Sequence, residues 1–401
     1  MKILIMTLHY PPFFEGGYEL NCKVVAEELI KRGHKVFILT NKKEIIEKEE
    51  NIFRILYEYN PLDNGSLKKR YYQLIWTYLS RKNYFITLNL AKQLKPDVAY
   101  IWQLSNMTML PLIALQKLNI PVVFHLGDYW LSCSKKYFVF EKNPLKRIYR
   151  KIITGVNNFN FLDLRHLLVI SNALKKEYIR LGFDEKNITI IPRGILSSMI
   201  IDLSKINQNK PNGQINLLYA GRVVKQKGID VAINAVNYLI NTMGFKNLRL
   251  DIIGKGDSKY KEELNNLVNS LQLQNYVSFI NQIPREILLE YYSGYDALLF
   301  PSVWEEPFGN TIIESMARGL PVIASEVGGV SEIITSGENG ILIPPNDFMK
   351  IAEAINTLIN DHDFRLELKY NAIKTIKEKF TQEIVCNQIE NYLFKTNNSY
   401  K

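Results

Sequence analysis

Two glutamates in the second half of the chain are spaced so that they could act on one ligand. Glu306 and Glu314 stand eight positions apart in the segment EEPFGNTIIESMARG, which spans residues 305–319. The proline and glycine near its start predict a loop, and the good helix formers from Thr311 to Arg318 predict a helix that ends at the following glycine. Free amide groups at the start of a helix attract sugar oxygens or phosphates. The segment therefore indicates a ligand site in which acids accompany a helix N-terminus.

Glu314 also has a purely structural explanation. Thr311 and Glu314 have the spacing of a capping box, in which the glutamate accepts a hydrogen bond from a free backbone amide near the helix start. That role would account for Glu314 without any ligand, but it leaves Glu306 without a function in the loop. Both interpretations of Glu314 remain open at this point.

A second candidate segment carries cations. Arg222 and Lys227 lie in GRVVKQKG, residues 221–228, directly after an apolar run that predicts a strand. Arginine offers a bidentate fork and lysine a point charge, and together they suit a diphosphate. A solvated turn is an equally good interpretation of this segment alone. The paired glycines Gly16 and Gly17 follow the first predicted strand and would let a ligand approach the backbone, although such pairs more often form ordinary turns.

These segments need a scaffold, and the chain of 401 residues is long enough for about two domains. Short apolar runs alternate with helical patterns in both halves, which predicts an α/β fold with parallel sheets. In the first half we expect strands at Lys2–Thr7, Val36–Thr40, Val98–Trp102, Pro121–Leu126, Leu167–Ile170 and Ile188–Ile191. In the second half we expect them at Ile215–Ala220, Leu248–Ile253, Val277–Ile280, Ala297–Pro301, Pro321–Ala324 and Ile341–Ile343. Helices are expected at Tyr18–Arg32, Gly228–Met243 and Tyr260–Leu271.

The pattern of apolar runs stops and restarts near the middle of the chain. A polar stretch at 196–213 has the composition of a linker and separates a domain at 1–195 from a second domain at 214–380. Two doubly wound domains joined in this way predict a cleft lined by the carboxyl ends of the strands, where ligands bind in open α/β sheets.

Composition excludes several classes of protein. With 47% hydrophobic and 22% charged residues, the chain is typical of an ordinary globular protein rather than a disordered one. Cys22, Cys133 and Cys386 lie far apart and indicate neither a zinc site nor a disulfide framework. The apolar run at the N-terminus is too short for a membrane span and lacks the pattern of a signal peptide, so we expect a cytoplasmic protein.

The net charge of +10 is unevenly distributed. Residues 1–190 hold 29 Lys and Arg against 17 Asp and Glu, whereas residues 191–401 hold 21 against 23. An anionic membrane surface, a phosphate-bearing substrate or nucleic acid could each attract such a basic half, and solvated helix faces could equally account for it. Of these we favour the anionic membrane surface and expect no nucleic acid partner. Aromatic residues stand among the basic clusters, which include Lys68, Lys69, Arg70, Lys146, Arg147 and Arg150.

Several segments together resemble the retaining glycosyltransferases of family 4, the group 1 enzymes with an E-x7-E motif. They are PPFFEGG, GRVVKQKG, DIIGKGD at Asp251–Asp257, EPFGNTIIESMARGLPVIAS, and EVGGVSEIITSGENGILIPPND at Glu326–Asp347. They occur in the family's order along nearly the whole chain. The resemblance implies a GT-B fold of two Rossmann-like domains, with a C-terminal helix at 381–401 that crosses back onto the first. It also implies that the second domain binds a nucleotide-diphosphate sugar and the first binds the acceptor.

The resemblance implies roles for single residues. Glu306 would contact the donor sugar, Glu314 the ribose hydroxyls, and Arg222 and Lys227 the diphosphate. The amides of Phe308, Gly309 and Asn310 would hold sugar hydroxyls, and Gly16, beside Gly17, would approach the donor from the first domain.

The sequence departs from the family where a catalytic histidine is usual. Members often carry His-Asp-Tyr-Trp, but this chain reads His125-Leu126-Gly127-Asp128-Tyr129-Trp130, with Gly127 in place of the histidine. His125 could take over the catalytic role beside Asp128, or it could be a core histidine.

The reaction expected is transfer of a hexose to a lipid-linked or polysaccharide acceptor at the inner face of the cell membrane. No metal is expected, because no DxD motif of the metal-dependent type stands out. The alternative is a catalytically silent partner that binds a nucleotide sugar and supports another transferase. A dinucleotide dehydrogenase is disfavoured because no G-x-G-x-x-G follows the first strand.

Overall fold

The computed structural model describes residues 1–14, 16–43, 49–58, 81–104, 107, 109–131, 162–205 and 213–400. Its contacts divide the chain into two compact units. One unit joins Met1–Pro192 to Val385–Lys401, and the other comprises Arg193–Ile384. The stretch at 196–213, which we expected to be a linker, falls within the second unit as far as it is described, and it contains the short helices η3 (Ser197–Met199) and η4 (Leu203–Lys205).

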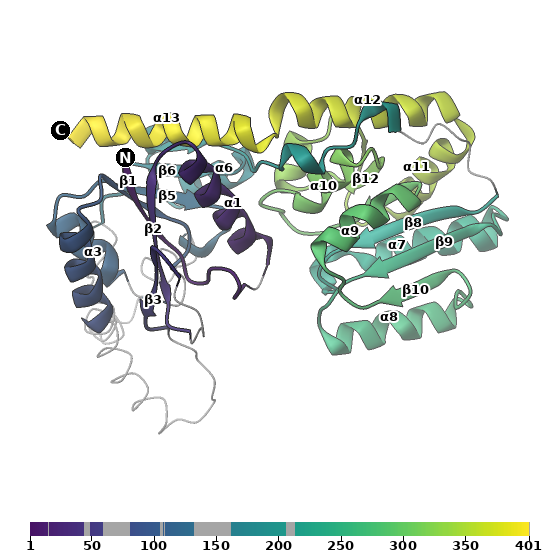
Figure 1. The fold of residues 1–401 in the computed structure, drawn as a ribbon. Helices are drawn as coiled ribbons and strands as arrows, with labels where there is room; N and C mark the ends of the chain where they lie inside the picture. The colour runs from purple at the N-terminus through teal and green to yellow at the C-terminus, as the bar shows by residue number, and fades with distance from the viewer. Residues whose placement is uncertain are drawn as a thin grey trace, which may run out of the picture. The chain divides into compact units, whose positions relative to one another are not determined.

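The first unit is built on a seven-stranded parallel sheet with the order β3-β2-β1-β4-β5-β6-β7 (Figure 1). Its strands are β1 (Lys2–Met6), β2 (Lys35–Asn41), β3 (Ile52–Leu56), β4 (Val98–Ile101), β5 (Val122–Leu126), β6 (Leu167–Val169) and β7 (Ile188–Ile190). The helices for which both ends can be given are α1 (Gly17–Lys31), α3 (Leu110–Lys117) and α6 (Asn172–Arg180), with the short η2 (Glu185–Asn187). Buried runs such as that of β1 are apolar on both faces because helices cover both sides of a parallel sheet.

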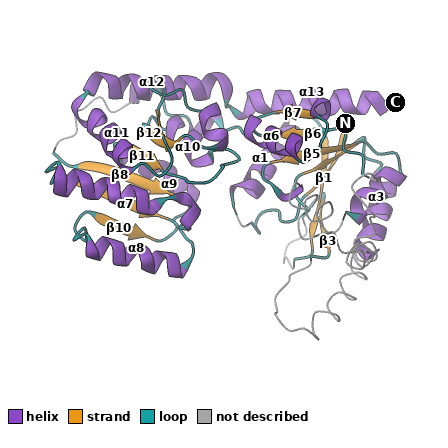
Figure 2. Ribbon diagram, turned by 180° about the vertical axis from the view of Figure 1, so that it is seen from behind, coloured by secondary structure: helices purple, strands orange, loops and turns teal. Residues whose placement is uncertain are grey.

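The second unit is built on a six-stranded parallel sheet with the order β10-β9-β8-β11-β12-β13. Its strands are β8 (Ile215–Ala220), β9 (Leu248–Ile253), β10 (Val277–Ile280), β11 (Ala297–Phe300), β12 (Val322–Ser325) and β13 (Ile341–Ile343). Its helices are α7 (Ile229–Asn237), α8 (Ser258–Ser270), α9 (Arg285–Tyr291), α10 (Asn310–Ala317), α11 (Phe348–Asn360) and α12 (His362–Lys379), which flank the strands in Figure 2. Shorter turns are η5 (Lys225–Lys227), the π-helical η6 (Tyr238–Thr242), η7 (Tyr292–Gly294) and η8 (Gly328–Glu332).

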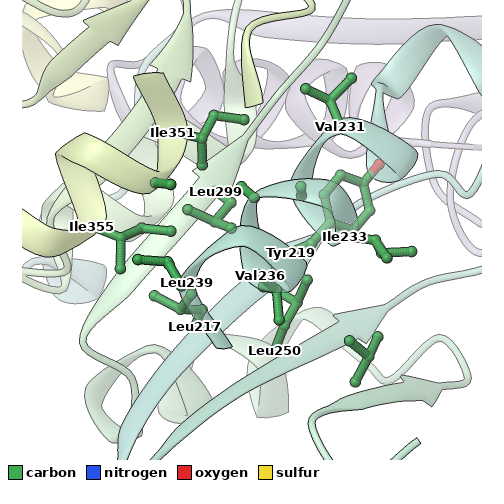
Figure 3. Close-up of a cluster of buried hydrophobic side chains, with 14 of the residues drawn as sticks. Leu217, Tyr219, Val231, Ile233, Val236, Leu239, Leu250, Leu299, Ile351 and Ile355 are labelled. Atoms are coloured by element: carbon green, nitrogen blue, oxygen red, sulfur yellow. The ribbon is translucent and has the colours of Figure 1, made fainter. Parts of the chain in front are cut away.

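A dense core fixes the strands from which the candidate site loops emerge. In Figure 3, Leu217 of β8 and Leu250 of β9 pack with Val236 of α7, and these three side chains are at most 1% exposed. Ile351 of α11 belongs to the same cluster. Since core packing of this density tolerates little movement, the carboxyl ends of β8 and β9 are held in fixed positions.

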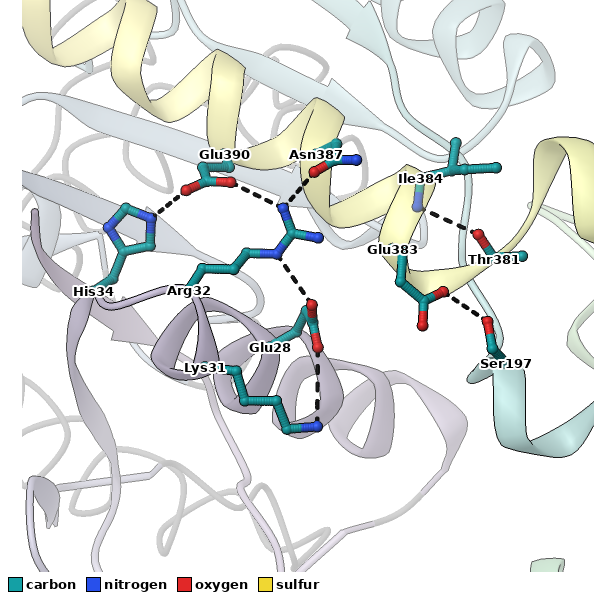
Figure 4. A network of polar contacts seen from close by, with 10 residues as sticks. All are labelled: Glu28, Lys31, Arg32, His34, Ser197, Thr381, Glu383, Ile384, Asn387 and Glu390. Atoms are coloured by element: carbon teal, nitrogen blue, oxygen red, sulfur yellow. Dashed lines mark hydrogen bonds and ion pairs between the residues drawn. The ribbon is translucent and has the colours of Figure 1, made fainter.

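The last helix of the chain, α13 (Gln382–Tyr400), packs on the first unit from Val385 onward. Its buried side chains Cys386, Ile389 and Leu393 join the core formed by β1, β2 and α1. Polar contacts reinforce this packing (Figure 4). Glu390 accepts hydrogen bonds from His34 Nε2 at 2.7 Å and from Arg32 at 3.0 Å.

We expect this contact of α13 to weaken in acid. Burial alone would raise the pKa of Glu390, but the hydrogen bonds from His34 and Arg32 outweigh it and lower that pKa. A carboxyl of lowered pKa stabilises the folded state above its unfolded value of about 4.3, and this stability is lost as the pH falls through the folded-state pKa. Hydrogen-exchange protection of α13 should therefore fall between about pH 5 and pH 3.

The matched variants are Glu390→Gln and, on the exposed side of α1, Glu27→Gln. Glu390→Gln should show reduced protection of α13 already at neutral pH, and Glu27→Gln should behave as the wild type. Equal hydrogen-exchange protection of α13 in the wild type and in Glu390→Gln, both at neutral pH and between about pH 5 and pH 3, would contradict a role for this carboxylate.

Candidate functional site

Four loops meet at the carboxyl edge of the second sheet. They are residues 221–228 after β8, 254–257 after β9, 301–309 after β11 and 326–330 after β12. The strand order reverses between β8 and β11, since β9 and β10 lie on one side and β12 and β13 on the other. Ligands of open α/β sheets bind at such a reversal. The candidate site thus lies where the sequence motifs are brought together.

Glycines let the backbones of these loops touch. A Cβ added to Gly228, whose φ is +62°, would lie 2.1 Å from the carbonyl oxygen of Pro301. A Cβ added to Gly328 would lie 2.2 Å from the carbonyl oxygen of Glu306. Similar close approaches join the β9 loop to the β8 loop, at Gly254 with Gly221 and at Gly256 with Val223. A side chain at any of these positions would push a neighbouring loop away.

Glu306 is the centre of the polar contacts at this edge. Its Oε1 atom accepts hydrogen bonds from Lys227 Nζ and from Ser302 Oγ, each at 2.5 Å. Glu306 is only 4% exposed and Ser302 is fully buried. Because both donors converge on Oε1, the carboxylate is held in one orientation.

The two predicted cations differ in their surroundings. Lys227 is the last residue of η5. Its Nζ lies 5.4 Å from the ring centre of Phe300 and 5.9 Å from that of Trp304. Cation–π contacts with these rings therefore accompany its ion pair with Glu306. Arg222 is exposed, and its side chain makes no hydrogen bond or ion pair with the residues that the structure describes. Its backbone is fixed, since its carbonyl accepts the hydroxyl of Tyr219 at 2.7 Å.

The predicted capping box at α10 is wrong. The N-cap of α10 is Gly309, with φ −143° and ψ 76°, and no side chain caps the helix. Thr311 already lies inside the helix, because the chain turns helical at Asn310, so its spacing to Glu314 no longer matches a cap. The start of α10 therefore has no side-chain cap. The side chain of Phe308 is buried against Phe380, so that residue can offer a ligand only its backbone.

Glu314 instead forms an ion pair with a residue from another helix. Its Oε1 accepts a hydrogen bond from Arg285 Nε at 2.7 Å. A terminal nitrogen of the same guanidinium lies 2.6 Å from the same oxygen. Burial raises the pKa of the Glu314 carboxyl, while Arg285 acts in the opposite direction. This pair joins the first residue of α9 to the middle of α10.

We expect a double-mutant cycle to detect this pair. Glu314→Gln and Arg285→Ala, made singly and together, should show a coupling of about 1–2 kcal/mol in the free energy of unfolding, because Glu314 is buried and Arg285 is half-buried. The exposed pair between Lys350 and Glu353, whose atoms lie 2.6 Å apart, is the control and should show less than about 0.5 kcal/mol. A coupling in the first cycle no larger than in the control would contradict a structural role for the pair.

His125 lies in the core of the first unit. It is 1% exposed, its ring stacks on Trp102 with centres 3.9 Å apart, and its Nδ1 lies 2.6 Å from the hydroxyl of Tyr100. The Tyr18 hydroxyl donates to its backbone carbonyl. These surroundings favour the core-histidine interpretation over a catalytic one.

The other predicted residues of the first unit are more accessible. Asp128, after β5, is half-buried, and its carboxylate accepts Trp130 N–H at 3.0 Å and Gln103 Nε2 at 3.3 Å. Gly16 and Gly17 are exposed at the start of α1. Nothing lies within 4 Å of a Cβ added to Gly16, so this glycine leaves open space rather than relieving a clash.

Some predictions fall outside the described residues. The basic clusters named above, with Lys68, Lys69, Arg70, Lys146, Arg147 and Arg150, belong to this group, as do Cys133 and Glu15, the glutamate of the PPFFEGG segment. Within the described part of the chain, no helix is both long and apolar enough to cross a membrane. No group of three or more His, Cys, Asp or Glu side chains that could hold a metal ion occurs in that part either.

Sequence reasoning missed Ser302 and Arg285. Ser302 directly follows Pro301 at the end of a buried strand, where a serine four residues before an acid is a weak signal for a hydrogen bond to it. Arg285 lies 29 positions from Glu314, and only the packing of α9 beside α10 brings the two together.

The fold and the site together define a class of protein. Two Rossmann-like units with parallel sheets are the GT-B architecture of glycosyltransferases. A family model described as Glycosyltransferase Family 4 matches residues 16–196. A second model, described as Glycosyl transferases group 1, matches residues 201–375. The chain belongs to the group 1, family 4 glycosyltransferases.

Individual relatives agree with this assignment. An uncharacterized glycosyltransferase of Methanocaldococcus jannaschii is 27% identical, over 98% of this chain and 97% of its own length. A capsular polysaccharide biosynthesis glycosyltransferase of Staphylococcus aureus is 28% identical, over 56% of this chain and 60% of its own length. A solved glycosyltransferase of Rickettsia africae shares the fold with a TM-score of 0.75 at 18% identity, covering 98% of each chain.

Proposed function

We propose that the protein transfers a hexose from a nucleotide-diphosphate sugar to a lipid-linked or polysaccharide acceptor, with retention of configuration, in cell-envelope or exopolysaccharide synthesis. The observation that carries this proposal is the convergence of Lys227 and Ser302 on one oxygen of Glu306 at the strand reversal of the second sheet. A cation and an oriented carboxylate beside the uncapped start of α10 suit a phosphorylated sugar.

In this proposal the second unit binds the donor and its residues act on the leaving group. Negative charge grows on the nucleoside diphosphate as its bond to the sugar breaks, and Lys227, Arg222 and the N-terminus of α10 stabilise that charge without a metal ion. Glu306 accepts hydrogen bonds from the sugar hydroxyls and favours positive charge developing at the anomeric carbon. Glu314, which Arg285 holds in place, accepts hydrogen bonds from the ribose hydroxyls.

In this proposal the first unit binds the acceptor. The open space beside Gly16 allows a ligand atom to stand where another residue would place a side chain. Asp128 offers a partly exposed carboxylate at the end of β5.

Relatives support this choice of substrates. HepE of Anabaena, solved in complex with UDP and glucose, matches 98% of this chain and 99% of its own at 21% identity, with a TM-score of 0.72. The relative from Staphylococcus aureus is named for capsular polysaccharide biosynthesis. A nucleotide sugar as donor and a surface glycan as product are therefore reasonable expectations for this chain.

The deciding experiment is a binding screen followed by turnover. UDP-, GDP- and ADP-glucose are tested by thermal shift, since a ligand that binds the folded state raises its apparent stability. The donor that binds is then assayed with glycan and lipid-linked acceptors, with and without EDTA, and the anomeric configuration of the product is read by NMR. We expect one donor to bind, equal rates with and without the chelator, and retention. Binding of none of the three, or an inverted product, would overturn the proposal.

The alternative function is a silent nucleotide-sugar-binding partner of another transferase. The enclosed position of His125, together with glycine at 127, favours it, because no exposed histidine follows β5 among the described residues. A protein that binds the donor but shows neither transfer of the sugar nor slow hydrolysis of the donor would point to this alternative.

We further propose that the basic half attaches to the inner membrane face. Vesicles with anionic lipid should bind the protein and neutral vesicles should not, because each basic residue near an anionic surface contributes about 1 kcal/mol. Charge reversal at Lys68, Lys69 and Arg70, or at Lys146, Arg147 and Arg150, should weaken co-sedimentation, and salt should screen it. Equal binding to both kinds of vesicle, or to neither at low salt, would leave a soluble acceptor as the better expectation.

A further inference from the structure

A polar pocket of about 480 Å³ lies toward the amino edge of the second sheet, and ligand pockets commonly measure about 300–1,000 Å³. Its walls come from β8, β9 and the turn between α9 and β11, and they include Asn216, Arg249, Asp251, Glu290, Tyr291 and Tyr295. Five positions along β8 separate Asn216 from Gly221, where the candidate site begins. At about 3.3 Å per residue this is about 16 Å, so the pocket is distinct from that site.

The face of β9 that lines the pocket is polar, although the strand lies inside the sheet. Leu250 and Ile252 pack in the core of the second unit. Because side chains alternate along a strand, Arg249 and Asp251 lie on the opposite face, and Asn216 of β8 stands beside Arg249 in the register. Both faces of a parallel sheet are usually apolar. The polar residues on this face therefore call for an explanation other than packing.

Asp251 fixes two of the side chains that line the pocket. It is only 9% exposed. Its Oδ1 accepts a hydrogen bond from Arg249 Nε at 2.9 Å, and its Oδ2 accepts one from the hydroxyl of Tyr295 at 2.9 Å. Arg249 also donates to Ser278 Oγ at 3.1 Å. The guanidinium and the tyrosine ring are thus held in place before any ligand arrives, as in a pre-organised binding site.

Other polar groups of the pocket keep their hydrogen-bonding capacity. The side chains of Asn216, Glu290 and Tyr291 make no hydrogen bond or ion pair with the residues that the structure describes. An amide and a phenol each donate and accept, whereas a carboxylate accepts only. The pocket therefore offers donors and acceptors side by side, which suits a ligand rich in hydroxyl groups.

An exposed aromatic ring borders the same pocket. Tyr291 is 45% exposed at the end of α9, and Ile287, one turn earlier on that helix, is 43% exposed. A sugar ring carries apolar C–H groups on its face and hydroxyls around its rim. Its face can pack on the ring of Tyr291 while its hydroxyls bond to the polar groups of the pocket.

The charges of the pocket favour a neutral ligand. Arg249 is the counterion of Asp251, and Glu290 adds a second negative charge. A phosphate or a nucleic acid would meet this excess of negative charge and be repelled. A metal ion is also disfavoured, because no metal-binding group of three or more His, Cys, Asp or Glu side chains occurs in the described part of the chain.

We propose that this pocket is a second ligand site of the protein and that it binds a neutral sugar unit of a glycan. The proposal does not rest on the proposed function, since the pocket uses none of the residues assigned to the donor or to the acceptor. A protein that contacts one glycan chain at two places holds it more tightly than either contact alone would allow.

The test measures glycoside binding to the full chain by ligand-observed NMR. The probes are the methyl α-glycosides of glucose, galactose and mannose, titrated to about 100 mM, a concentration that fills a site of millimolar Kd. We expect at least one of them to bind. Inorganic phosphate, compared with chloride at equal ionic strength, should not displace it.

Two variants and a control locate the binding. Tyr291→Ala should weaken the Kd of that glycoside about tenfold, because the aromatic contact is lost, and Glu290→Gln should weaken it about threefold or more. Glu286→Gln removes an exposed charge from the same helix outside the pocket and should leave the Kd unchanged. All three changes are at exposed positions, so melting temperatures should stay at the wild-type value and show that each variant is folded.

The outcomes that would overturn the proposal are specific. They are no binding of any glycoside, displacement of the glycoside by phosphate, a Kd that is unchanged in both Tyr291→Ala and Glu290→Gln, or a Kd that rises as much in Glu286→Gln. No nucleotide sugar enters these measurements. A protein that binds a glycoside here but no donor in the thermal-shift screen would therefore reject the proposed function and leave this site in place.

Discussion

Replacing Glu306 by glutamine should lower turnover by about a hundredfold, a loss of the size seen when one contact that stabilises transition-state charge is removed. The carboxylate is 4% exposed and is oriented by Lys227 and Ser302 through its Oε1 atom. Glutamine keeps the shape of the side chain but loses the charge that favours a positive anomeric centre. Because the proposed contact is with the sugar, the Kd for the nucleoside diphosphate should change by no more than about threefold.

The matched control for Glu306 is its exposed neighbour. Glu305→Gln removes the same charge from the same loop and should leave kcat within about twofold of the wild type. Steady-state kinetics with the donor found by the screen, together with calorimetric titration of the nucleoside diphosphate, measures both quantities. Equal losses of turnover and of nucleotide affinity in Glu306→Gln would contradict a contact confined to the sugar.

Removing either cation should weaken nucleotide binding, with different effects on stability. For Lys227→Ala and for Arg222→Ala we expect the Kd of the nucleoside diphosphate to rise by about tenfold or more, because each loses a charge-assisted hydrogen bond to phosphate. Arg222 is exposed, so its loss should leave the melting temperature unchanged. Lys227 pairs with buried Glu306, so its loss leaves an unpaired carboxylate and should destabilise the protein by about 3 kcal/mol.

The sequence alone predicts that both cation variants keep their stability, and the ion pair with Glu306 changes that expectation for Lys227. Lys225→Ala is the control, since Lys225 is exposed on the same short helix η5. It should affect neither property. Unchanged nucleotide affinity in both Lys227→Ala and Arg222→Ala would reject the diphosphate site.

The strands of the fold could be predicted closely because their apolar runs, although short, are sharply bounded. The predicted bounds of β8, β9, β10 and β13 are those of the structure. The strand β3, residues Ile52–Leu56, was not predicted, because Arg54 interrupts its apolar run. In the structure that arginine pairs with Glu49 and donates to the carbonyl oxygens of Tyr10 and Pro11, a role that depends on tertiary contacts.

The candidate site could be located from its motifs, but its contacts could not. Spacing along the chain places Glu306 and Lys227 near the ends of two strands, and only the strand order shows that these strands are neighbours. The capping box at Glu314 fits the local sequence, but local spacing cannot reveal Arg285, which another helix supplies. His125 fits both a catalytic and a core role by sequence, and burial beside Trp102 is a property of the folded chain.

The glycines at the carboxyl edge of the second sheet affect how a mutational scan of this enzyme should be interpreted. Gly228, Gly254, Gly256 and Gly328 each stand within 2.2 Å, measured from an added Cβ, of a carbonyl oxygen in an adjoining loop. Substitutions there would abolish activity by displacing loops, including the one that carries Glu306, although none of these residues needs to touch a substrate. Efforts to change the donor specificity would therefore gain most by varying the side chains between these glycines. Intolerance at a glycine would report on the architecture of the site and not on the ligand.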